Sequence, residues 1–135
     1  MILTYGSQQD YDGMVGKADG ESNWTPEDFQ ALAEFMTKFN QELIDSGELV
    51  ETRGLTEPVH TRRIRTQNGV PVVTDGPYAE TQEVLAGYWI VECDSFDRAT
   101  EIASKLNDCP GPEAAAASYY ADVRPIAESA EDLAL

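Results

Sequence analysis

The segment from Val84 to Cys93 constrains the fold most, because it is apolar at both odd and even positions. Successive side chains of a β-strand point to opposite faces of a sheet, so a strand of this kind must be buried on both sides. The two sets are Val84, Ala86, Tyr88 and Ile90 on one face, and Leu85, Trp89 and Val91 on the other. The helices of a single 135-residue chain can cover one face. We therefore predict that a second copy covers the other face, which makes the protein a homodimer.

Capping residues and apolar spacing predict two helices. Thr25 can cap the free N–H groups of the first helix, Pro26 suits its first turn, and apolar residues then recur every three or four positions. We expect this helix to run from Pro26 to Ser46, with Gly47 as a left-handed stop. Asp94-Ser95 begins a second amphipathic helix, which we expect to end by residues 107–110.

The remaining segments predict strands and loops. Asn68-Gly69 tolerates the positive φ angles of a tight turn, and Pro71 favours the edge of a sheet. We expect a strand at residues 1–5, a long loop at residues 6–23, hairpin strands at residues 60–66 and 70–73, and a last strand at residues 118–124.

This order of elements predicts the fold class. Strand, helix, hairpin strands, strand, helix and strand follow one another as in an α+β, ferredoxin-like split β-α-β domain, here with an extra hairpin strand. We place the domain at residues 1–126 and an acidic C-terminal tail at residues 127–135.

The net negative charge of the chain limits the classes of molecule that it can bind. Asp and Glu number 25 against nine Lys and Arg, which gives a formal charge of −16 and opposes binding to nucleic-acid phosphates or to anionic lipid. No apolar run reaches the about 18 residues of a spanning helix, and the start resembles no export signal, so we expect a cytoplasmic protein. Cys93 and Cys109 lack the spacing of a zinc site, and we expect no metal and no cofactor.

Three carboxylates after the hairpin are candidate site residues. Asp75, Glu80 and Glu83 lie within nine positions, and neighbouring negative charge can raise the pKa of a carboxyl group toward acid–base use. Asp75 precedes Gly-Pro, so its carboxylate can instead bind backbone N–H groups and fix a turn. The sequence leaves both interpretations open.

Cationic residues supply a second group of candidates. His60, the one histidine of the chain, is expected in a strand beside arginines and is the second candidate catalytic residue with Asp75. Arg63 and Arg65 share a strand face and can hold a small anionic ligand through bidentate contacts. The alternatives are a surface role for His60 and ion pairs between the arginines and the surrounding acids.

The segment Asp75-Gly76-Pro77-Tyr78-Ala79-Glu80-Thr81-Gln82-Glu83 carries a resemblance to a known family. It resembles the DGPF-type branch of the YCII-related proteins, whose pattern is Asp-Gly-Pro-Phe-Ala-Glu-Thr-Lys-Glu followed by a Gly-Tyr-aromatic strand. Tyr78 replaces Phe and Gln82 replaces Lys, while Gly87-Tyr88-Trp89 matches the strand. The likeness covers most of the chain and adds Tyr78, with Glu80 and Glu83, to the ligand-binding candidates.

The resemblance implies a homodimer similar to the dimeric α+β barrels, with a cavity between sheet and helices. Some relatives are suggested to use a His-Asp pair, but the expected first helix contains no His, and His60 is not carried over as the partner of Asp75. Members of this branch tend to be encoded near extracytoplasmic-function sigma factors, which implies a regulatory association.

Two functions follow from these observations. The first is a non-catalytic, regulatory or accessory protein that binds a small molecule in a dimer cavity and meets a basic protein, such as a sigma factor, with its acidic exterior. The alternative is a small lyase or isomerase-like enzyme in which Asp75 acts as general acid or base.

Overall fold

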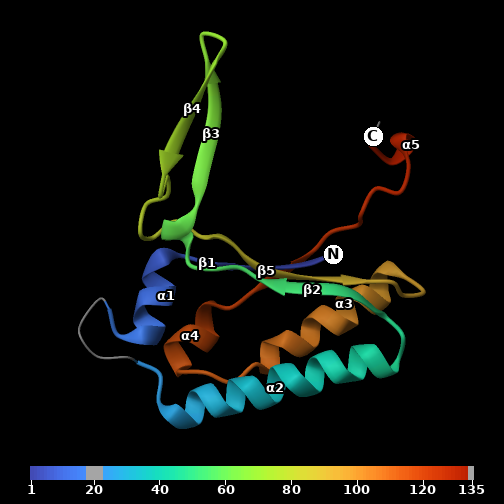
Figure 1. Cartoon of the computed structure of the whole chain (residues 1–135). Coiled ribbons are helices and arrows are strands. Elements are labelled where there is room, and N and C mark those ends of the chain that lie inside the picture. The colour runs from blue at the N-terminus through green and yellow to red at the C-terminus, as the bar shows by residue number, and fades with distance from the viewer. Residues whose placement is uncertain (18–22, 134–135) are drawn as a thin grey trace.

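The computed structural model describes residues 1–17 and 23–133 and shows an α+β chain built on a four-stranded antiparallel sheet (Figure 1). The sheet contains β1 (Ile2–Gly6), β2 (Leu49–Gly54), β5 (Val84–Val91) and β6 (Ala121–Val123), in the spatial order β2-β5-β1-β6. Helices α2 (Pro26–Asp45) and α3 (Phe96–Ser104) lie on one side of it. This strand order, with α2 in the crossover from β1 to β2 and α3 in the crossover from β5 to β6, is the ferredoxin-like arrangement.

The strand register separates a covered face from an uncovered face of the sheet. Ile2 pairs with both Trp89 and Val123, and all three pack in the core beneath the helices. The next row along the strands, Asp122, Leu3, Tyr88 and Arg53, therefore points to the opposite face. No helix of the described chain covers that face in Figure 1. The strand β5, which we predicted to be buried on both faces, is therefore covered on one face within a single chain.

The first predicted helix is confirmed as α2. Thr25 accepts a hydrogen bond from the backbone N–H of Asp28, and the Asp28 side chain accepts one from the Thr25 N–H, which is a complete capping box. Gly47 follows the helix with φ of 76°, as expected for a left-handed stop. Phe39 and Leu43 are the buried residues of its apolar stripe.

The second predicted helix is α3, capped by Ser95, whose side chain accepts from the N–H of Arg98. A short 3₁₀ segment, η2 (Lys105–Asp108), continues it. Ile102 and Leu106 are fully buried, and Phe39 meets Trp89 edge to face with ring centroids 5.5 Å apart. The core therefore forms where α2 and α3 meet the sheet.

The predicted hairpin exists, but it forms a separate two-stranded sheet. β3 (Arg62–Gln67) and β4 (Val70–Asp75) pair only with each other around the Asn68-Gly69 turn and project away from the main sheet on its uncovered side (Figure 1). Both turn residues have positive φ, 51° and 77°. Almost every residue of the hairpin is exposed.

Two local predictions about the ends of the chain were wrong, and one strand was not predicted. The segment expected to be a loop contains helix α1 (Gln8–Val15), which begins at a Ser7 capping box that the sequence reading missed; residues 18–22 of that segment lie outside the described residues. β2 was not predicted as a strand, although it forms one edge of the main sheet. The predicted last strand is shorter, because residues 113–118 form α4 (Glu113–Ser118) before β6.

Two further segments complete the described chain. A 3₁₀ turn, η1 (Pro58–His60), connects β2 to the hairpin. The segment after β6 ends in the short helix α5 (Ala130–Leu133), where the Asp132 carboxylate accepts the N–H groups of Glu128 and Ser129. This end lies on the uncovered side of the sheet in Figure 1.

Candidate functional site

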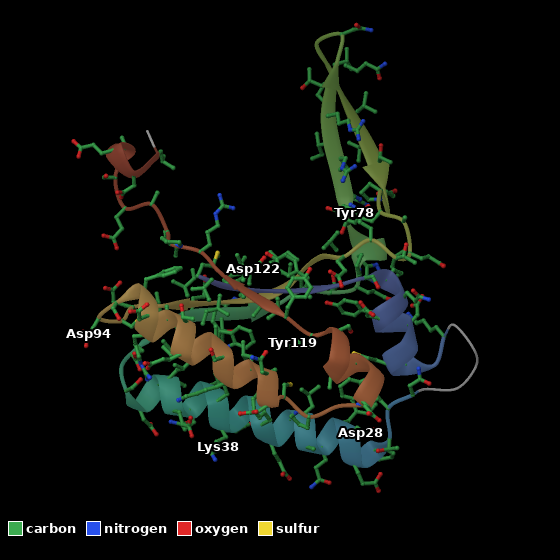
Figure 2. All side chains as sticks on the ribbon, turned by 180° about the vertical axis from the view of Figure 1, so that it is seen from behind. Asp28, Lys38, Tyr78, Asp94, Tyr119 and Asp122 are labelled. Carbon is green, nitrogen blue, oxygen red and sulfur yellow. The ribbon has the colours of Figure 1, made fainter. Side chains whose placement is uncertain are left out.

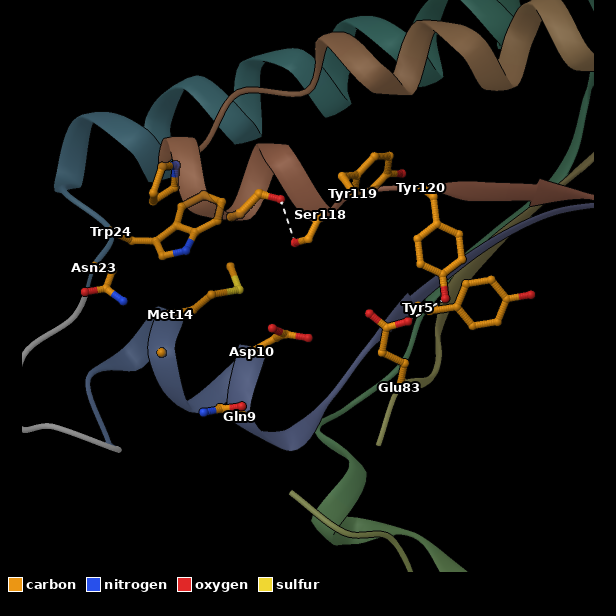
Figure 3. Close-up of a pocket in the computed structure, with 13 residues that line it drawn as sticks. Tyr5, Gln9, Asp10, Met14, Asn23, Trp24, Glu83, Ser118, Tyr119 and Tyr120 are labelled. Carbon is orange, nitrogen blue, oxygen red and sulfur yellow. Dashed lines mark hydrogen bonds between the residues drawn. The ribbon is translucent and has the colours of Figure 1, made fainter. Parts of the chain in front are cut away.

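A pocket of about 660 Å³ lies between α1, α4 and the adjoining ends of β1 and β5 (Figure 3). We call it the tyrosine pocket. Its walls combine aromatic and acidic side chains, namely Tyr5, Asp10, Trp24, Glu83, Tyr119 and Tyr120. A volume of several hundred Å³ with apolar walls and a few converging polar groups is typical of small-molecule sites.

Helix α1 supplies one wall of the pocket, and its cap fixes Asp10. The Asp10 Oδ2 accepts hydrogen bonds from the Ser7 backbone N–H and from the Ser7 Oγ, both at 2.8 Å. Ser7 is buried, with 4% of its surface exposed. These two bonds hold the carboxylate at the helix start beside the pocket.

A short hydrogen bond joins the segment before β5 to the segment before β6. The Tyr120 hydroxyl donates to Glu83 Oε2 over 2.5 Å, and this bond raises the pKa of Tyr120 to about 12. The Tyr120 ring stacks on Tyr5 with centroids 5.4 Å apart, and a hydrogen bond to Asp122 raises the pKa of Tyr5. Both phenols are therefore neutral at physiological pH.

Trp24 closes another side of the pocket. Its ring lies 5.3 Å from that of Phe29, at the start of α2. It also packs against Gly111, where a Cβ atom would sit only 3.1 Å from the indole. The absence of a side chain at Gly111 therefore lets the indole lie against the segment that leads into α4.

Tyr119 joins the pocket to the core. Its ring packs against the core cluster, and burial raises its pKa to about 12. Its hydroxyl is buried, and no hydrogen-bond partner for it exists in the described part of the chain. A buried polar atom without a partner costs about 1–3 kcal/mol, which is the kind of cost that functional pockets carry.

Of the seven predicted site residues, Glu83 lines this pocket. Asp75 lies at the base of the hairpin, 78% exposed, where its carboxylate accepts from Arg62 Nε at 3.1 Å. The turn at Asp75-Gly76 is held by the Gly76 N–H, which donates to the Thr61 carbonyl. A catalytic role for Asp75 stays a prediction, with its carboxylate in an exposed ion pair outside the pocket.

His60 was expected in a strand, which was wrong: it ends the 3₁₀ turn η1. Its Nε2 lies 3.2 Å from Glu57 Oε1, a carboxylate that also binds Lys17 and Gln8. The hydrogen bond from Gln8 is the main cause that lowers the pKa of Glu57, with Lys17 second. His60 therefore belongs to a polar cluster that ties η1 to α1.

The remaining predicted residues lie at the hairpin and its base. The Arg63 guanidinium sits over the Tyr78 ring, 5.1 Å from its centroid, and Figure 2 shows Tyr78 where the hairpin meets the body. The pairing places Arg63 and Arg65 on one face, as predicted. The Glu80 carbonyl accepts from the Gln9 N–H, which anchors the motif segment to α1.

Sequence reasoning missed the aromatic walls. The consecutive pair Tyr119-Tyr120 beside a strand was the available signal, but nothing in the sequence brings it next to Glu83, 37 positions away. Glu83 lies just before β5, and Tyr119-Tyr120 lies just before β6. The two segments come together because β1 pairs with both strands.

The YCII-related domain family matches residues 1–126. This chain belongs to that family. An uncharacterised protein of Rhizobium meliloti (strain 1021) is 28% identical over 106 residues, which cover 78% of this chain and 82% of the relative. Neither comparison assigns an activity to the YCII-related domain described above.

Among residues 1–17 and 23–133, no group of three or more His, Cys, Asp or Glu could hold a metal ion. None of the described helices is long and apolar enough to cross a membrane. Cys93 and Cys109 are both free thiols, and burial raises the pKa of Cys109.

Proposed function

We propose that this YCII-related chain binds a small organic molecule in the tyrosine pocket and serves an accessory or regulatory role. The observation that carries the proposal is the pocket itself, which is lined by four aromatic side chains and two carboxylates. Apolar walls supply affinity for such a ligand, and a few fixed polar groups supply its orientation.

The arrangement supports binding more than proton transfer. The phenols of Tyr5, Tyr119 and Tyr120 all have raised pKa values and remain protonated at neutral pH. Asp75, which the enzyme alternative requires, lies outside this pocket in its ion pair with Arg62. The pocket thus offers hydrogen bonds and ring faces to a ligand.

A variant that fills the pocket tests the proposal. Gly13 lies on the α1 wall, and a Cβ atom there would meet nothing within 4 Å. Gly13→Leu should fill the pocket and, because leucine favours helix over glycine by about 1 kcal/mol, should keep the melting temperature unchanged or higher. A fragment library screened by thermal shift should give ligands that stabilise the wild type and not Gly13→Leu.

Ala33→Leu is the matched control, because it adds the same side chain on an exposed position of α2 outside the tyrosine pocket. It should respond to every ligand as the wild type does. Ligands that stabilise Gly13→Leu as well as the wild type would show that they bind elsewhere, and the proposal would fail.

We further propose that the chain is a homodimer of the dimeric α+β barrel type, joined through the uncovered sheet face. Leu3, Tyr88 and Ile90 belong to that face, which no helix of the described residues covers within one chain. The hairpin rises beside it with three arginines and one aspartate, in a chain of charge −16, so its charge complements the acidic body of a second copy. Light scattering should give twice the chain mass at micromolar concentration; a monomer there would contradict this proposal.

The DGPF-type motif at residues 75–83 supports a narrower placement. We propose that the chain belongs to the DGPF branch, acts in the cytoplasm and associates with a basic protein such as an extracytoplasmic-function sigma factor. Co-elution with the sigma factor encoded nearest to its gene tests the association, and separate elution at micromolar concentrations would argue against it. Cell fractionation tests the location, and grouping of the sequence with relatives that lack Asp-Gly-Pro would reject the branch.

A further inference from the structure

The charges around the tyrosine pocket are all of one sign among the described lining residues. Asp10 and Glu83 line it, and none of the lining residues that the structure describes is a lysine, arginine or histidine. The hydrogen bonds from Ser7 and Tyr120 use Oδ2 of Asp10 and Oε2 of Glu83. The second oxygen of either carboxylate can therefore bind a donor group of a ligand.

The aromatic walls, like the two carboxylates, favour a positively charged ligand. Tyr5, Trp24, Tyr119 and Tyr120 border the space, and aromatic ring faces attract cations placed within about 6 Å of their centroids. Figure 3 shows the Trp24 indole and the Tyr120 ring on different sides of the pocket, with Asp10 projecting from α1 and Glu83 beside the Tyr120 hydroxyl. Aromatic faces combined with carboxylates are the chemistry by which proteins recognise ammonium groups.

The rest of the chain opposes an anionic ligand at this place. The formal charge is −16, so an anion approaching the pocket is repelled, whereas a cation is attracted. Two of the three hairpin arginines have partners of their own: Arg62 binds Asp75, and Arg63 lies over Tyr78.

We propose that the tyrosine pocket takes an organic cation, namely a protonated amine or quaternary ammonium group carried on an aromatic or apolar body. The apolar body packs against Trp24 and the tyrosine rings, and the ammonium group lies beside Glu83 and Asp10. This inference rests on the proposed function, since it names the class of ligand for the same pocket.

Three probes of one shape and different charge test the inference. Phenethylammonium, 2-phenylethanol and phenylacetate share a ring and a two-carbon or shorter arm, and isothermal titration calorimetry at pH 7 measures their affinities for the full chain. We expect phenethylammonium to bind at least tenfold more tightly than 2-phenylethanol, and phenylacetate to bind most weakly.

A pair of matched variants ties that preference to the site. Glu83→Gln removes one of the two carboxylates that line the pocket, and Glu92→Gln makes the same change at an exposed position outside the pocket. Glu83→Gln should reduce the preference for the ammonium probe over the alcohol to about threefold or less, while Glu92→Gln should leave it unchanged. Melting temperatures of both variants verify that each is folded.

The possible failures differ from one another. Equal affinities for phenethylammonium and 2-phenylethanol, both lost in Gly13→Leu, would overturn the cation assignment and leave the binding function intact. Tighter binding of phenylacetate would likewise overturn it. No binding of any probe at millimolar concentration would count against the cation assignment and the proposed function together.

Discussion

The four-stranded sheet with its helices, which we call the body, and the β3–β4 hairpin both contain apolar residues such as isoleucine, but the two regions are stabilised in different ways. In the body, Ile102 is fully buried between helix and sheet, whereas in the hairpin Ile64 is 72% exposed. The body pairs four strands and covers them with helices, and the hairpin pairs two strands with no cover. Isolated two-stranded hairpins are marginal in water, so the hairpin depends on its turn and on whatever packs against it.

The comparison teaches that local sequence signals can form an element without giving it a place in the core. The Asn68-Gly69 turn suffices to bring β3 and β4 together. Burial of the body instead required α2 and α3 to be brought onto a sheet whose strands are distant in sequence. Ion pairs differ between the two regions in the same way. In the body, the Arg98 and Glu48 side chains are 35% and 15% exposed, whereas in the hairpin the Arg62 and Asp75 side chains are 76% and 78% exposed.

The largest difference is expected from matched truncations of isoleucine. Ile102→Ala should lower the free energy of unfolding by about 2–5 kcal/mol, because it leaves a cavity in the core. Ile64→Ala should change the stability of the single chain by less than about 0.5 kcal/mol. Urea denaturation at several protein concentrations measures both.

The same experiment also tests the dimer. Ile102→Ala should be destabilising at every concentration, and Ile64→Ala only where the wild type is dimeric. A loss of several kcal/mol in dilute Ile64→Ala would show that the hairpin is part of the folding core after all.

Two glycines with the same backbone conformation give the next comparison. Gly47 after α2 and Gly69 in the hairpin turn have φ of 76° and 77°, and a Cβ atom at either would meet nothing within 4 Å. Alanine in this conformation costs roughly 1–2 kcal/mol. Gly47→Ala should lower the melting temperature of the whole chain, whereas Gly69→Ala should mainly speed amide hydrogen exchange in β3 and β4. Equal losses of melting temperature would mean that hairpin and body unfold as one unit.

The smallest effects are expected from the two ion pairs, and pH separates them. The hydrogen bond from Arg98 is the main cause that lowers the pKa of Glu48 to about 2 from an ordinary 4.5. A carboxyl group with a depressed folded-state pKa stabilises the fold above pH 4.5 and loses that contribution as pH falls toward 2. Glu48→Gln should therefore be less stable than the wild type at pH 7, with the difference shrinking below pH 4.5.

Asp75→Asn is the control in the hairpin, where both partners are exposed and screened by water. Its melting temperature should stay near that of the wild type across the same pH range. A marked loss for Asp75→Asn at pH 7 would make this carboxylate a structural support of the motif turn.

Much of the fold could be predicted because its signals are local. The Thr25 cap, the apolar spacing of α2, the Gly47 stop and the Asn68-Gly69 turn each specify a conformation within a few residues. Helix α1 was missed because its eight residues are mostly polar and none is buried, and the Ser7–Asp10 capping box is the signal that marks its start. Strand β2 was missed because Glu51, Thr52 and Arg53 lack the apolar alternation of a half-buried strand.

The site was less predictable than the fold. The motif carboxylate Glu83 was singled out correctly as a residue beside a strand, yet Tyr5 and Tyr120 were not connected with it. Their proximity depends on β1 pairing with β5 on one side and β6 on the other, a relation between three distant segments. The spacing of these residues in the sequence does not predict that they lie close together.

The sequence by itself determined the two helices that cover the sheet, α2 and α3, the place where the hairpin turns and the apolar character of both faces of β5, because caps, turns and side-chain alternation act over neighbouring residues. Only the tertiary structure decided that the hairpin stands outside the main sheet and that Glu83, rather than Asp75, borders a pocket with four aromatic rings. Strand pairing brings residues together across the whole chain, and the free energy of burial depends on that final arrangement.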